Sequence, residues 1–196
     1  MEDLHEIALL QQELEQRLLE VTGTTNQNPW AAISELAFTR FMTDWTGDEH
    51  ECLGGNTEGF DVRNTVTGET YEVKHTRTTA RNYVYGGLKT KSANKAVFIK
   101  WDYNETMQPE YCIVLDMSLV QENLNESCNR LYSKRLHQMT LEEGLPFEDL
   151  TNQFSNYVFD NWSRKFGCCR LDHIWSVDSG HWSNRIKIHQ KIKTGY

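Results

Sequence analysis

Two short stretches with strand character, residues 59–63 and 70–75, flank a turn at residues 67–68 and predict a β-hairpin. The second stretch reads Tyr-Glu-Val-Lys-His, so two charged residues flank a valine in a strand with few apolar side chains. Successive side chains of a strand point to opposite faces, so Glu72 and Lys74 share one face in any pairing register. Such a hairpin is either a solvated structure with a cross-strand ion pair or the base of a polar site.

The expected pairing register brings further charges to this face. A two-residue loop at residues 67–68 would place Asp61 opposite Lys74 and Arg63 opposite Glu72. Directly paired residues share a face, so these four side chains would lie together. The apolar residues of the hairpin would point to the core: Val62, Tyr71 and Val73. A longer loop would change the partners but not the shared face of Glu72 and Lys74.

The chain as a whole predicts a single α/β domain over residues 1–196, with a mixed central sheet flanked by helices and a core at about residues 29–117. Its 196 residues can bury a sizeable core without disulfides or metals. The sequence has no run of about 18 apolar residues, and its N-terminus lacks the features of a signal peptide. We therefore expect no membrane partner and a cytoplasmic location. The odd number of cysteines, 5, favours reduced thiols.

Local patterns place the helices and the remaining strands. Apolar residues at steps of three and four predict a helix over residues 4–21, which we expect to pack on the core. Asn28 and Pro29 predict the start of a second helix, as N-cap and first helical residue. Strands are expected at residues 51–54, 96–103 and 111–117, and helical, polar structure from 121 to about 162 with a break at 144–146.

The charge distribution is uneven. The net charge of −8 argues at first against nucleic acid as a partner. Residues 61–100, however, carry 8 basic against 3 acidic residues, and residues 161–196 carry 7 against 2, so each segment is net +5. Local basic surfaces, rather than net charge, form a footprint for phosphates. Uneven solvated charge remains the alternative interpretation of these segments.

The shared hairpin face suggests a metal site. The carboxylates of Asp61 and Glu72 are hard oxygen ligands suited to Mg²⁺, and the main-chain carbonyl of Val73 would lie near the same ion. Lys74 could hold or help to deprotonate an attacking water, while the ion neutralises charge on a phosphate. The pattern therefore outlines a site for phosphodiester hydrolysis, with Mn²⁺ as a substitute ion.

Asp61, followed after ten residues by Glu72-Val73-Lys74, resembles the PD-(D/E)XK nucleases, the restriction-endonuclease-like superfamily. The resemblance covers roughly residues 29–117 and implies that Asp61, Glu72 and Lys74 are catalytic. Many members also carry a glutamate on the helix before the hairpin, and Glu35 occupies that place, from where it could lean into the site or point to water. Phe60 precedes Asp61 where the motif has proline. Members usually have a helix after the strand that carries Lys74, and Gly86-Gly87 predicts that this helix is short, late or interrupted, near residues 88–95.

Basic residues after the hairpin and near the C-terminus are candidates for phosphate contacts. We expect them to bind double-stranded DNA: Arg77, Arg81, Lys89, Lys91, Lys95, Arg164, Lys165, Arg185 and Lys187. The C-terminal helical and basic segment, 118–196, would serve DNA recognition or dimerisation. Cys168, Cys169 and His173 do not match the usual spacing of zinc ligands, which favours free thiols over a metal site.

These observations predict a Mg²⁺-dependent, site-specific DNA endonuclease of restriction or homing type. A homodimer is expected because one active site per chain cuts one strand. Two alternatives remain open: a nucleic-acid-binding regulator without catalysis, and an RNase or a junction or repair nuclease with the same site.

Overall fold

The structure, a computed structural model, describes residues 2–22, 28–53, 59–102, 108–125 and 129–166. The chain divides into two compact units, Met1–Tyr157 and Val158–Tyr196. The candidate site lies in the first unit. None of the helices in the described ranges is long and apolar enough to cross a membrane.

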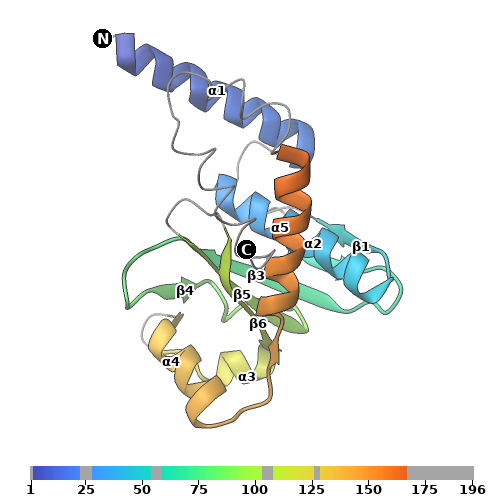
Figure 1. The fold of residues 1–196 in the computed structure, drawn as a ribbon. Coiled ribbons are helices and arrows are strands. Elements are labelled where there is room, and N and C mark those ends of the chain that lie inside the picture. Colours follow the sequence, from blue (N-terminus) through green and yellow to red (C-terminus); the bar gives the residue numbers. More distant parts are fainter. Residues whose placement is uncertain (1, 23–27, 54–58, 103–107, 126–128, 167–196) are drawn as a thin grey trace, which may run out of the picture. The chain divides into compact units, whose positions relative to one another are not determined.

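Figure 1 shows the arrangement of the helices and strands. Their order along the chain is α1 (Glu2–Thr22), α2 (Pro29–Thr46), β1 (His50–Cys52), β2 (Val62–Asn64), β3 (Thr70–Thr76), β4 (Val84–Gly86), β5 (Lys95–Trp101), β6 (Pro109–Asp116), α3 (Met117–Glu122), β7 (Arg130–Tyr132), α4 (Ser133–His137), the π-helical turn η1 (Gln138–Glu142), β8 (Glu148–Asp149) and α5 (Thr151–Phe166). The start of α2 is as predicted, because the Asn28 side chain accepts a hydrogen bond from Trp30 N and Pro29 opens the helix.

A six-stranded sheet of order β1-β2-β3-β5-β6-β8 forms the centre of the first unit. Only β3 and β5 are parallel within it, and the other neighbours are antiparallel. The expected mixed α/β architecture with a central sheet flanked by helices is therefore confirmed. Strand β3 lies in the interior of the sheet, and its first four residues are all buried. The charged strand of the predicted hairpin is thus a central strand rather than a solvated one.

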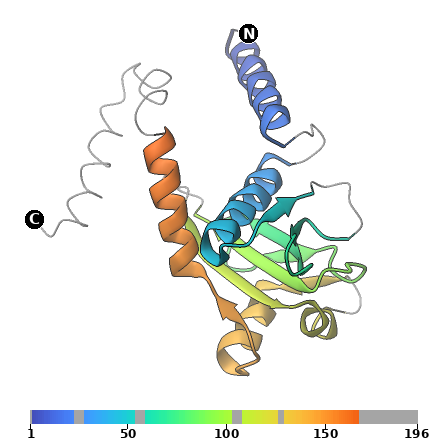
Figure 2. The same ribbon diagram turned by 90° about the vertical axis from the view of Figure 1, so that its right-hand side faces the viewer.

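Aromatic side chains attach α2 and the start of α5 to one face of the sheet. Phe38 of α2 contacts the ring of Tyr71 at 5.5 Å between centroids, and Phe154 of α5 contacts Trp101 at 5.8 Å. The indole N–H of Trp101 donates to the Ser34 hydroxyl across 2.8 Å. Residues of β3 and β5 with odd numbers therefore face these helices, because side chains alternate along each strand. Figure 2 shows α2 on this side of the sheet.

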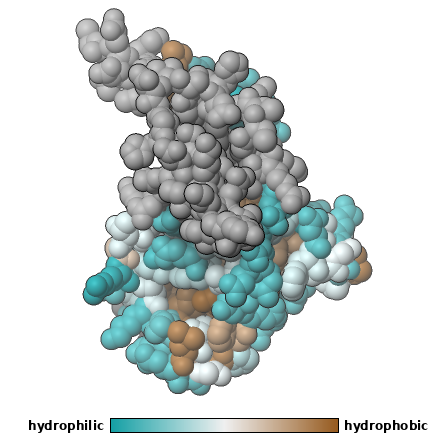
Figure 3. All heavy atoms as spheres, viewed as in Figure 1, coloured by the Kyte–Doolittle hydropathy of each residue, from teal (hydrophilic) through white to brown (hydrophobic). Residues whose placement is uncertain are grey.

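The other face of the sheet is covered by α3, α4 and the two-stranded sheet of β4 and β7. Tyr85 of β4 packs on Phe98 of β5 with ring centroids 4.9 Å apart, and Leu88 and Leu131 are fully buried in the same cluster. Figure 3 shows apolar side chains on the outer surface of this cover. Leu141 of η1 is exposed. Glu72 and Lys74 belong to this face, opposite α2.

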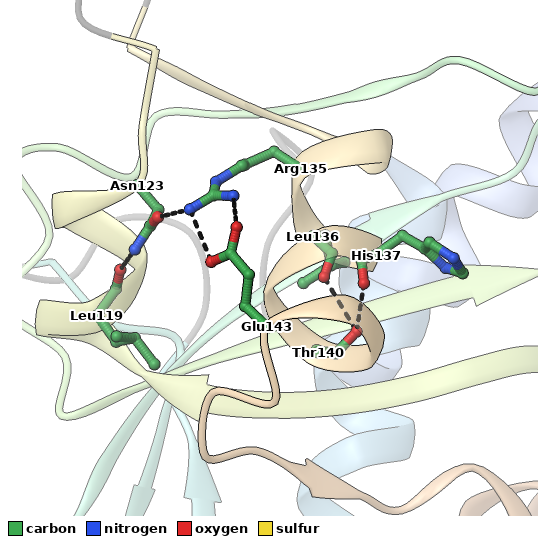
Figure 4. A network of polar contacts seen from close by, with 7 residues as sticks. All are labelled: Leu119, Asn123, Arg135, Leu136, His137, Thr140 and Glu143. Atoms are coloured by element: carbon green, nitrogen blue, oxygen red, sulfur yellow. Dashed lines mark hydrogen bonds and ion pairs between the residues drawn. The ribbon is translucent and has the colours of Figure 1, made fainter.

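A polar network ties the outer helices of this cover together (Figure 4). The guanidinium of Arg135 pairs with Glu143 and donates to the side chain of Asn123 at the end of α3. Asn123 in turn donates to the Leu119 carbonyl at 2.8 Å. This network holds α3 against α4 and so fixes the position of residues that α3 presents to the sheet.

The hairpin register differs from the predicted one. Val62 pairs with Tyr71 and Arg63 with Thr70, so Arg63 does not face Glu72 and instead forms an ion pair with Glu51. The cause is Asn64, whose side chain accepts hydrogen bonds from the backbone N–H groups of residues 66 and 67 and lengthens the loop to residues 65–68. The partner changes by two residues, so the shared face of Glu72 and Lys74 is preserved, and the apolar residues of the hairpin are buried as expected.

Three further expectations about the fold are wrong. No helix lies between β3 and β5, where residues 77–94 form an irregular crossover that contains β4. Between residues 121 and 162, η1 ends at Glu142 just before the expected break at 144–146, but β7 (Arg130–Tyr132) also interrupts the segment, where helical structure is expected. Leu10 and Leu14 of α1 are 55 % and 40 % exposed, so this part of the first helix does not pack on the core.

Candidate functional site

Asp61 lies where β2 separates from β3. Strand β2 begins at Val62, so the backbone N–H of Val73 in β3 has no strand partner on that side. The Asp61 carboxylate takes this place, and its Oδ2 accepts the Val73 N–H at 2.8 Å. Asp61 is 7 % exposed. The carbonyl of Val73 leaves the strand on the same side as its N–H, toward Asp61.

Glu72 is fully buried and is the acidic centre of the cluster. Its Oε1 lies 2.6 Å from the ammonium nitrogen of Lys74 and 2.9 Å from that of Lys91. Both contacts are ion pairs, and Oε2 has no hydrogen-bond partner. Two charge contacts therefore hold Glu72, and one carboxylate oxygen is left without a donor, which is an unfavourable state for a buried anion.

The two carboxylates interact. Burial raises the pKa of Asp61 to about 6, and the neighbouring negative charge of Glu72 acts in the same direction, while the Val73 N–H, Lys74 and Lys91 act in the opposite direction. The acids are therefore close enough to repel each other, and both lysines are close enough to oppose that repulsion. Asp61, Glu72, Lys74 and Lys91 are named the acid–lysine cluster below.

The segment that carries Lys91 is held from several sides. Leu88 anchors it in the apolar cluster, and the Ser92 N–H donates to the Gly59 carbonyl at 3.3 Å, close to Asp61 in the chain. The side-chain nitrogen of Gln121 in α3 lies 3.1 Å from the carbonyl oxygen of Leu88 and 3.0 Å from that of Lys91. Residues 87–92, the Lys91 loop, are thus positioned by both the hairpin and α3.

Sequence reasoning places Lys91 in the DNA-binding set and misses its contact with Glu72. No local pattern could have found this contact, because Lys91 reaches Glu72 through the crossover between the parallel strands β3 and β5. The crossover geometry depends on long-range contacts, among them those made by Gln121.

The structure permits a test of whether Mg²⁺ fits this cluster. Within the described ranges, no three or more His, Cys, Asp or Glu side chains form a group suited to a metal ion. Mg²⁺ needs fewer, because it usually binds one or two carboxylates together with waters and substrate phosphate. The unpaired Oε2 of Glu72 and the mutual repulsion of Asp61 and Glu72 are both relieved by a cation. The cluster therefore fits Mg²⁺ through Asp61 and Glu72, with the Val73 carbonyl at the same strand edge.

Glu35 is buried on α2, with 4 % of its surface exposed, so its carboxylate does not point to water. The helix covers the sheet face that carries Tyr71 and Val73. Glu35 consequently approaches from the face opposite Glu72 and Lys74. A contribution of Glu35 to the metal site stays a prediction.

The basic residues expected to bind DNA differ in their contacts and exposure. Arg77 lies 4.6 Å above the ring centroid of Trp30, and Lys95 pairs with Asp116 at 2.8 Å. Lys91 belongs to the acid–lysine cluster. Arg81 and Lys89 are exposed. Arg164 and Lys165 belong to α5, where their side chains are not described, and the remaining candidates fall outside the described residues: Arg185, Lys187, Cys168, Cys169 and His173.

The chain matches none of the protein-family models with which it was compared, and no curated protein sequence resembles it significantly.

Proposed function

We propose that the protein is a Mg²⁺-dependent endonuclease that hydrolyses phosphodiester bonds in double-stranded DNA. The observation that carries this proposal is the fully buried Glu72, which lies beside Asp61 and between two lysines in a central strand. A carboxylate buried in this position is unfavourable for folding, so its charge is better explained by a role in binding a ligand. Hard oxygen ligands next to ammonium groups suit an ion and a phosphate together.

The arrangement of the strands supports membership of the restriction-endonuclease-like fold. The predicted motif places its aspartate and its Glu-x-Lys element on adjacent strands, and Asp61 directly precedes β2, the neighbour of β3. The crossover after β3 departs from the family pattern, since it holds β4 rather than a helix. This departure concerns the connection and leaves the positions of Asp61, Glu72 and Lys74 unchanged.

Asp61, Glu72 and Lys74 each have a role under this proposal. Asp61 and Glu72 would hold Mg²⁺, which supplies positive charge to the phosphate as it is attacked. Lys74, one quarter exposed, would leave Glu72 and hold the attacking water through its ammonium group. Arg81 and Lys89 would contact the DNA backbone. Site specificity, a restriction or homing role and a homodimer belong to the same proposal.

Cleavage of supercoiled plasmid in Mg²⁺, Mn²⁺, Ca²⁺ or EDTA tests this function, with Asp61→Asn as the site variant. Asparagine keeps an acceptor for the Val73 N–H but removes the charge, so cleavage should be lost while the fold remains. Asp44→Asn, which removes an exposed carboxylate of α2, is the matched control and should cut normally. A wild-type protein that binds DNA but never cuts it in Mg²⁺ or Mn²⁺ would instead be the binding regulator. Parallel incubation with RNA distinguishes the RNase.

A further inference from the structure

Lys91 makes the same contact as Lys74 but comes from a different part of the fold. The two ammonium groups lie 2.9 Å and 2.6 Å from Oε1 of Glu72, and both side chains are about one quarter exposed. Lys74 is on the same strand as Glu72, whereas Lys91 reaches it from a separate loop. A single carboxylate oxygen is therefore neutralised twice, from two directions.

The contacts of Lys91 are suited to exchange. A lysine ammonium on a flexible stem can be redirected without moving the backbone, and the Lys91 side chain is 26 % exposed. The backbone of the Lys91 loop is held by Gln121 and by the contact between Ser92 and Gly59. The loop thus keeps the Lys91 side chain near Glu72 whether or not the ion pair is formed.

A divalent ion and an ammonium group compete for the same carboxylate. An ion held by Asp61 and Glu72 would take over the neutralisation of Glu72, and both lysines would then lose their partner. An ammonium group released beside a bound ion is adjacent to the place where a phosphate would bind, and lysine binds phosphate well as a point charge.

We propose that Lys91 is an exchangeable counter-ion of the site, which neutralises Glu72 in the ion-free protein and contacts a non-bridging phosphate oxygen of the substrate when a divalent ion occupies Glu72. The second half of this statement rests on the proposed nuclease function, and the first half does not. Lys91 is then a catalytic residue, distinct from the exposed Lys89 in the same loop.

The first measurement uses the ion alone. Mn²⁺ binding is measured by electron paramagnetic resonance, without DNA, for the wild type, Lys91→Ala, Lys91→Gln and the control Lys89→Ala. Removing the competing ammonium should tighten Mn²⁺ binding about fivefold, the size expected from the loss of one partly exposed ion pair. Lys89→Ala should remain within about twofold of the wild type. Lys74 still neutralises Glu72 in the variants, and Lys91→Gln keeps the side-chain length in case Lys91→Ala fails to fold.

The second measurement uses plasmid at saturating Mg²⁺. Lys91→Ala should cut at least about tenfold more slowly than the wild type, because the positive charge that contacts the reacting phosphate is lost. Lys91→Arg should recover part of the cleavage rate. Lys89→Ala should weaken DNA binding more than it slows cleavage. Tighter ion binding together with slower cutting supports the proposal, because a lysine that only holds the loop would not move the two quantities in opposite directions.

The outcomes separate the two claims. If Lys91→Ala and Lys91→Gln bind Mn²⁺ no more tightly than Lys89→Ala does, the exchange is overturned whatever the cleavage rates are. If the wild type binds Mn²⁺ but cuts neither DNA nor RNA, the nuclease function and the phosphate contact fail together, and tighter binding by the Lys91 variants still supports the exchange. If the wild type does not bind Mn²⁺, both the metal site and the exchange are wrong.

Discussion

Replacing Asp61 by asparagine should make the ion-free protein more stable at alkaline pH. The pKa of Asp61 is raised from 3.8 to about 6, first by burial and then by the charge of Glu72. The folded protein therefore holds this proton more tightly than the unfolded chain does. The resulting stabilisation is fully present below about pH 3.8 and is lost as the pH rises through 6. Above that pH, ionised Asp61 opposes folding.

The size of the effect follows from the pKa change. A rise from 3.8 to about 6 corresponds to about 3 kcal/mol in the free energy of unfolding. The asparagine side chain would be neutral at every pH and would still accept the Val73 N–H, although a neutral acceptor is weaker than a carboxylate. We therefore expect Asp61→Asn to be more stable than the wild type by about 1–3 kcal/mol at pH 8, and by close to nothing at pH 4.

Urea unfolding in EDTA at pH values from 4 to 8 measures this difference. Titrating groups that do not interact with Asp61 contribute equally to both proteins, so their pH dependence cancels in the comparison. Asp44→Asn, at an exposed position of α2, should show no such trend. Adding Mg²⁺ at pH 8 should stabilise the wild type and not Asp61→Asn, because the ion binds the folded site. A difference that is the same at all pH values, or a less stable Asp61→Asn at pH 8, would refute the reasoning.

Three other substitutions test the surroundings of the cluster. Gly59→Ala should destabilise the protein by about 1–2 kcal/mol in urea unfolding, since residue 59 has a φ of +85° and a Cβ would lie 2.6 Å from the Ser92 hydroxyl oxygen. Gln121→Ala should leave the global stability nearly unchanged but accelerate amide hydrogen exchange in residues 87–92, because the Gln121 side chain binds carbonyls of that loop. Arg77→Ala should cost about 1 kcal/mol by losing its contact with Trp30, without changing the salt dependence of DNA binding; a flatter salt dependence would place Arg77 on the DNA instead.

The polar face of the hairpin could be predicted because it depends on local rules. Alternation along β3 places Glu72 and Lys74 together in any register. The register was predicted wrongly, because it depends on the Asn64 side chain, which accepts hydrogen bonds from two backbone N–H groups and adds residues to the loop. Asparagine is a common turn residue, so its position before the turn was the signal that could have found the longer loop.

No local sequence pattern could predict the crossover after β3 or the position of Lys91. Gly86 and Gly87 indicate an interrupted helix, but the segment instead pairs as β4 with β7, a strand that follows much later in the chain. Such pairing is decided by tertiary contacts, which override local preference. Lys91 reaches Glu72 for the same reason, so a sequence alone shows it only as one of several basic residues.

Stability alone does not account for a buried glutamate at position 72. Its neighbour across the parallel ladder is Ala96, which is fully buried in the apolar cluster with Leu88. An apolar residue would suit that environment, and replacing buried ion pairs by apolar side chains is often neutral or stabilising. The charged side chains instead determine the net charge of the site, and therefore whether it attracts a phosphate. With both acids ionised, two carboxylates and two ammonium groups sum to zero, and a bound Mg²⁺ would leave a double positive charge. Under the proposed function, the site therefore attracts a phosphodiester only after it holds the ion, which makes ion binding the first event and DNA engagement the second.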